Sequence, residues 1–113
     1  MHPIRLMFCV SLGAALLFCS ACGPARPMTM EEFNGFCYQS DTGGRFKDCD
    51  TISVCGPYNS VMSIPQGSLG KCLSECESIH DSQVFMYTAT GCAGVNDNAR
   101  DWCQRYCRTN YPQ

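Results

Sequence analysis

The sequence predicts a small, mainly α-helical domain that is stapled by disulfides and has an irregular loop and one candidate short strand. Eleven of the 113 residues are cysteine, a proportion typical of disulfide scaffolds. Two cysteine pairs, Cys72/Cys76 and Cys103/Cys107, have a spacing of four, which places both sulfurs on one face of a helix. An export signal leaves about 90 residues for the fold, and so short a chain often needs covalent support.

The first 21 residues have the features of an export signal. Residues 1–5 carry one positive charge, and residues 6–18 form an apolar run that is too short to span a bilayer comfortably. The small residues Ser20 and Ala21 directly precede Cys22. This arrangement resembles the bacterial lipobox, although Cys19 stands where an aliphatic residue is usual. The resemblance implies cleavage before Cys22 and attachment of a diacylglycerol to its sulfur.

The chain is therefore expected to consist of a lipoprotein signal peptide (1–21), a lipidated tether (22–28) and a disulfide-rich helical domain (29–113). By analogy with lipoproteins, Gly23 after the cysteine favours the outer membrane if the cell is Gram-negative. The alternative is an ordinary signal peptide cut after Ala21, Gly23 or Ala25, which would release a secreted protein. Eight cysteines follow Cys22, an even number that suits complete pairing.

The first helix is expected at 30–39. Thr29 and Glu32 form a capping-box sequence at its start, and Met30, Phe33 and Cys37 give it one apolar face.

The region 45–67 is the least helical part of the pattern. Turns are expected at 56–60 and 64–67, and the short pieces 51–54 and 60–63 are β-prone.

The later part of the chain predicts two more helices. Ser68 can cap a helix over 69–80 whose apolar stripe contains Cys72 and Cys76. The apolar and aromatic run 84–88 is expected to be a short strand or a buried extended segment. Candidate caps at 96–98 precede a helix over 99–108.

Eight cysteines permit 105 pairings. If the two helices with paired cysteines are antiparallel, the bonds are Cys72–Cys107 and Cys76–Cys103. The spacing resembles the twin Cx3C helical hairpin of small mitochondrial intermembrane-space chaperones and plant hairpin defence peptides. The resemblance implies a similar hairpin geometry and no shared function. For the other four cysteines we expect the pairs Cys37–Cys49 and Cys55–Cys92.

Little in the sequence favours catalysis or a cofactor. His80, the one histidine after the signal, is expected on the surface beside Asp81, near a helix C-terminus, and no catalytic motif accompanies it. The cysteine spacing would permit zinc, but export favours disulfides over a metal site. The seven basic and ten acidic residues from Cys22 onward are scattered, which disfavours nucleic acid as a partner.

We therefore expect a non-enzymatic lipoprotein of the cell envelope, bound to the membrane through its lipid and with a binding or structural role. Most aromatic residues are expected in the core, but Tyr58, Met62 and Ile64 would form a site for an unidentified protein partner if they were exposed together. The alternative function is a secreted cysteine-rich peptide, such as a toxin, a defence factor or an inhibitor.

Overall fold

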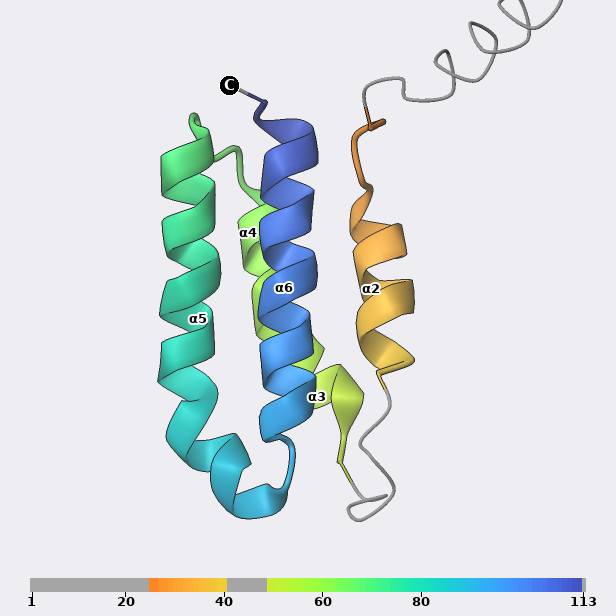
Figure 1. The fold of residues 1–113 in the computed structure, drawn as a ribbon, viewed down its shortest axis with the longest axis vertical. Coiled ribbons are helices and arrows are strands. Elements are labelled where there is room, and N and C mark those ends of the chain that lie inside the picture. Colours follow the sequence, from red (N-terminus) through yellow and green to blue (C-terminus); the bar gives the residue numbers. More distant parts are fainter. Residues whose placement is uncertain (1–24, 41–48, 113) are drawn as a thin grey trace, which may run out of the picture.

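The computed structural model describes residues 25–40 and 49–112, and within these ranges it contains helices and no strand (Figure 1). The two long helices, α5 (Leu69–Thr90) and α6 (Ala93–Asn110), form an antiparallel hairpin. Helix α2 (Met30–Tyr38) packs on α6, and a short helical segment lies behind the hairpin. The protein is thus a mainly α-helical, disulfide-stapled domain, as the sequence predicts.

Helix α2 begins with the expected capping box. The backbone N–H of Glu32 donates to Thr29 Oγ1 at 3.1 Å, and the N–H of Thr29 donates to the Glu32 carboxylate at 3.0 Å. These bonds satisfy amides that a helix start leaves without partners. Phe33 and Cys37 are buried, so the inner face of α2 packs against the core.

The segment expected to be irregular and β-prone is helical instead, over α3 (Thr51–Cys55), the 3-10 turn η2 (Gly56–Tyr58) and α4 (Asn59–Ser63). Asp50 starts it, because its carboxylate accepts hydrogen bonds from the backbone amides of Ile52 and Ser53. The hydrogen bond from the Ser53 hydroxyl, followed by these backbone bonds, lowers the pKa of Asp50 below its usual value. Burial of Val54, Tyr58 and Val61 on one helical face outweighs the β preference of the local sequence.

Helix α5 continues ten residues beyond the expected end at His80, so the prediction of a strand or extended segment at 84–88 is wrong. Ser68 caps its start as expected, accepting from the Lys71 amide at 3.1 Å. Beyond Cys76 the buried face of α5 is polar, with His80 and Gln83 inside, whereas Phe85 is 90 % exposed. The second half of the helix therefore could not be predicted from hydrophobic periodicity, because its buried positions are polar.

Gly91 ends α5 in the left-handed conformation, with φ of 79°, and its amide donates to the Tyr87 carbonyl. Helix α6 then begins at Ala93, six residues before the expected start. The expected caps at 96–98 are part of the helix, because Val95 and Asn96 are buried and extend its inner face.

Two disulfides join the long helices. Cys72 is bonded to Cys107 and Cys76 to Cys103, with Cα atoms 5.6 and 5.9 Å apart. This is the pairing expected for antiparallel helices, in which the first sulfur of one helix lies beside the last sulfur of the other.

The expected pairs Cys37–Cys49 and Cys55–Cys92 are wrong. The structure has Cys37–Cys55 and Cys49–Cys92 instead, with Cα separations of 6.1 and 5.5 Å. The helical conformation of α3 explains the difference, because it buries Cys55 toward α2. Cys49 precedes that helix and is bonded to the α5–α6 connection at Cys92.

A polar network crosses the core between the hairpin and η2. The Tyr58 hydroxyl donates to Asn96 Oδ1 at 2.7 Å, and Gln83 Nε2 donates to the same oxygen at 3.0 Å. Asn96 Nδ2 donates in turn to the His80 carbonyl at 3.1 Å. Burial raises the pKa of Tyr58 far above its usual value, so its hydroxyl remains a donor.

Candidate functional site

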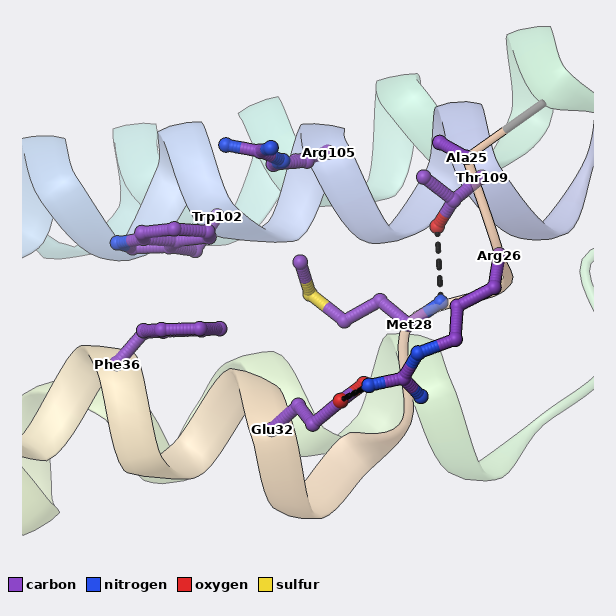
Figure 2. A pocket seen from close by; sticks show the side chains of 8 residues that line it. All are labelled: Ala25, Arg26, Met28, Glu32, Phe36, Trp102, Arg105 and Thr109. Carbon is purple, nitrogen blue, oxygen red and sulfur yellow. Dashed lines mark hydrogen bonds and ion pairs between the residues drawn. The ribbon is translucent and has the colours of Figure 1, made fainter. Parts of the chain in front are cut away.

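A groove of about 170 Å³ opens between α2 and α6, beside the point where the chain enters the domain (Figure 2). Its sides come from three segments: the extended residues before α2, the side of α2 that faces α6 and the adjacent side of α6. The lining residues are Ala25, Arg26, Met28, Glu32, Phe36, Trp102, Arg105 and Thr109.

Two stacked aromatic rings form the apolar side of this groove. Phe36 on α2 and Trp102 on α6 lie with ring centroids 4.1 Å apart and planes inclined by 8° (Figure 2). The guanidinium of Arg105 lies 5.2 Å from the centre of the Trp102 ring, within range of a cation–π interaction. Phe36 remains 46 % exposed, so the edges of the stacked rings are accessible to solvent.

The charged side of the groove is an ion pair between Arg26 and Glu32. The hydrogen bond from the Thr29 amide, and then the Arg26 guanidinium, lower the pKa of Glu32 below its usual value. Arg26 is 75 % exposed, so its guanidinium can also reach a bound anion.

The segment before α2 is fixed against the end of α6. The N–H of Met28 donates to Thr109 Oγ1 at 3.1 Å, and Asn110 Nδ2 donates to the Met28 carbonyl at 2.9 Å. Met28, the last residue of the expected tether, is 9 % exposed and its side chain extends between the helices (Figure 2). Sequence reasoning missed this role, although an apolar residue just before the Thr29 cap is the position of a hydrophobic staple.

His80 is not the surface residue that the sequence predicts. It lies within α5, is 9 % exposed and has a carboxylate at each ring nitrogen, with Asp97 2.7 Å from Nε2 and Asp81 3.1 Å from Nδ1. Burial lowers the pKa of the imidazole and is the largest single influence, but the two carboxylates together outweigh it, so the net shift is upward. The geometry suits a protonated ring that donates from both nitrogens.

The carboxylates around His80 also have the spacing of metal ligands. Oxygens of Glu77 and Asp81 and a ring nitrogen of His80 lie within 4.8 Å of one another. Each ring nitrogen of His80 is already hydrogen-bonded to a carboxylate, so a metal would have to displace one of these bonds to reach the imidazole. This cluster is better explained as a charged link between α5 and α6.

The sulfurs of Cys76, Cys103 and Cys107 are equally close, with Cys76 Sγ 3.5 Å from Cys107 Sγ. All three belong to disulfides and are completely buried. A metal ligand or a redox nucleophile must be a thiolate, so in the oxidised protein these atoms have a structural role.

The expected partner surface of Tyr58, Met62 and Ile64 is not assembled. Tyr58 is fully buried and Met62 is partly buried, whereas Ile64 is 60 % exposed. A helical register explains this outcome, because Tyr58 shares the inner face of the segment with Val54 and Val61.

Cys22, the expected site of lipid attachment, lies outside the described residues, as do Ser20 and Ala21. Within residues 25–40 and 49–112, no helix combines the length and hydrophobicity that crossing a bilayer requires. The four disulfides are those of an exported domain.

The chain matches no protein-family model, and neither a curated protein nor a solved structure is significantly similar to it.

Proposed function

We propose that this protein is a membrane-anchored lipoprotein whose exported domain is a binding module and not a catalyst. The proposal of a lipid anchor rests on the sequence Ser20-Ala21-Cys22, which Cys19 separates from the apolar signal core. Two or three acyl chains on Cys22 would hold the protein stably, because one chain alone gives only marginal membrane binding.

Only a short segment separates Cys22 from the domain, so a lipid on Cys22 would also hold the domain close to the membrane surface. Met28 is held against α6 by two hydrogen bonds and follows Cys22 by only six residues. Even fully extended, six residues span about 20 Å, so the domain would stay close to the bilayer.

The groove between α2 and α6 supports a binding role. It combines the exposed edge of a stacked aromatic pair with two guanidinium groups, from Arg105 and from Arg26, which is paired with Glu32. This combination suits a ligand with an apolar part next to an anionic one. The ionisable cluster outside the groove, around His80, links two helices and leaves neither ring nitrogen free for proton transfer.

Mass spectrometry of the mature protein tests the anchor. We expect an N-terminus at Cys22 that carries about 600–900 Da of lipid, from two or three acyl chains. Cys22→Ala should abolish the lipid modification and leave the four disulfides of the domain intact.

A free, unmodified N-terminus would contradict the proposal. It would favour the second candidate, a secreted cysteine-rich peptide. The high disulfide content suits that candidate equally well, because such small domains are often released and folded outside the cell.

A further inference from the structure

We propose that the end of the domain at which the chain enters rests on the surface of an anionic lipid bilayer. We call this the anchor-proximal end. It comprises the loop before α5 with Ile64 and Pro65, the first turn of α5 with Lys71, and the end of α6 with Arg105, Arg108 and Tyr111. The inference rests on the proposed function only in that a lipid on Cys22 would bring this end to the membrane.

Hydrogen bonds from three parts of the chain assemble the anchor-proximal end. Thr109 and Asn110 hold the entering chain at Met28. On the other side of α6, the N–H of Gln66 donates to the Tyr111 hydroxyl at 2.9 Å, which fixes the loop before α5. The entry of the chain, the start of α5 and the C-terminus accordingly lie at one end of the molecule (Figure 1).

Charge along the α5–α6 hairpin changes sign at the Cys76–Cys103 disulfide. On the anchor-proximal side, three basic residues accompany one acid: Lys71, Arg105, Arg108 and Glu75. On the other side, acids remain in excess even when the imidazole of His80 is counted as a base: Glu77, Asp81, Asp97 and Asp101 against Arg100 and His80. An anionic bilayer attracts the first end and repels the second.

The acids at the anchor-proximal end are largely compensated. Glu75 pairs with Lys71 and Glu32 pairs with Arg26, while Glu31 is exposed at the start of α2. Arg105 and Arg108 are exposed and form no ion pair with a described residue, so they can contact lipid phosphates.

Apolar side chains next to these charges can enter the interface. Ile64 is 60 % exposed, Pro65 is exposed beside it, and Tyr111 is partly exposed at the end of α6. An aliphatic side chain, a tyrosine and flanking basic residues are what lipid headgroup regions accommodate.

The opposite end is also apolar, but its charge is wrong for an anionic membrane. Phe85 and Ile52 are 90 % and 64 % exposed, yet the adjoining part of the hairpin carries the excess of acids. The charge of the two ends therefore selects the orientation, with the acidic end directed away from the bilayer.

Vesicle co-sedimentation of the unlipidated chain from residue 23 onward, which lacks both the signal and Cys22, tests the inference at low salt. We expect binding to vesicles of equal parts phosphatidylglycerol and phosphatidylcholine, and several-fold less binding to phosphatidylcholine alone or at high salt. Arg108→Glu should weaken the binding about tenfold, because it removes an attractive charge and adds a repulsive one. The matched control, Arg100→Glu, makes the same charge change beyond the disulfide and should have little effect.

A second matched pair tests the apolar contact. Ile64→Ser should reduce vesicle binding several-fold, whereas Ile52→Ser, which removes an equally exposed isoleucine from α3, should not. Circular dichroism checks that all variants fold.

Equal binding to both kinds of vesicle, no binding to either, or equal effects of the paired variants would overturn the inference. So would displacement of the protein by soluble glycerol phosphate, which would indicate a site for small anions. Because the tested chain carries no lipid, these results are independent of the mass of the mature N-terminus. Failure here with a lipid found on Cys22 would remove only the bilayer contact.

Discussion

At the scale of single residues, His80 has the least ordinary environment in the described chain. Its ring is nearly buried, and both nitrogens face carboxylates, one on its own helix and one on α6. Arg100 opposes the positive charge of the ring, and Asp97 supports it. The net upward shift of the imidazole pKa means that the folded state favours the protonated form.

Replacing His80 with glutamine should therefore make stability less dependent on pH. A raised folded-state pKa contributes stability that is complete below the unfolded value, about 6.5, and is lost as the pH rises through the folded value. The thermal midpoint of the wild type should exceed that of His80→Gln by more at pH 5.5 than at pH 8.5. Asp97→Asn, which removes the partner on α6, should reduce the pH dependence in the same direction.

The assignment of a charged imidazole would be contradicted if the difference in thermal midpoint between wild type and His80→Gln stayed constant from pH 5.5 to 8.5. It would also be contradicted if that difference grew toward high pH. Thermal unfolding followed by circular dichroism at closely spaced pH values measures it. The range lies above the lowered pKa values of Glu32 and Asp50, so those carboxylates remain ionised throughout.

At the scale of elements, the polar network around Asn96 determines how η2 meets the hairpin. One amide oxygen accepts from Tyr58 on η2 and from Gln83 on α5, and the amide nitrogen donates to α5 again. Such a buried network specifies one arrangement of its elements, because any other would leave polar groups without partners.

Tyr58→Phe should lower the free energy of unfolding by about 1–2 kcal/mol, since it removes a buried donor from the network. Tyr87→Phe is the matched control. The Tyr87 hydroxyl donates to the Ser53 carbonyl at 3.2 Å in an exposed position, so its loss should cost less than about 0.5 kcal/mol. Urea denaturation of the three proteins measures both values, and equal losses would argue against the network.

At the scale of the whole molecule, disulfides replace much of an ordinary core. Of the fourteen buried hydrophobic residues in the described ranges, seven are cysteines, and the aliphatic residues among them are three valines and an alanine. So small a core supplies little stability by itself, which explains why the hairpin, α2 and α3 are all cross-linked.

Removal of the Cys49–Cys92 bond by substituting alanine at both positions should cost about 4 kcal/mol. The bond closes a loop with a sequence separation of 43, and long loops lose the most unfolded-state entropy on cross-linking. Cys49 is only partly buried, so its replacement costs little packing, whereas Cys92 is buried and its replacement adds a small packing loss. Urea denaturation without reductant measures the loss, and a value below about 1 kcal/mol would mean that this cross-link is dispensable.

Much of the local structure could be predicted from the sequence. The caps at Thr29 and Ser68 and the helix starts that follow them depend on residues within one turn. The pairing of Cys72 with Cys107 and of Cys76 with Cys103 follows from helical spacing once the helices are antiparallel. The lipid on Cys22 stays a prediction.

The second half of α5 and the helices at 51–63 required tertiary contacts. Their buried faces include His80, Gln83 and Tyr58, which are polar or amphipathic, so hydrophobic periodicity was a poor guide there. The groove combines Met28, Phe36 and Trp102 from three segments, and no local pattern relates them.

The sequence by itself thus determined the helical class, the cysteine-stapled hairpin and the starts of α2 and α5, because each depends on spacing or on hydrogen bonds between near neighbours. Only the tertiary structure decided the partners of Cys37, Cys49, Cys55 and Cys92. It also decided the burial of His80 and the separation of a basic end from an acidic one. These features depend on which residues distant in the chain meet, and that is fixed by packing of the whole domain.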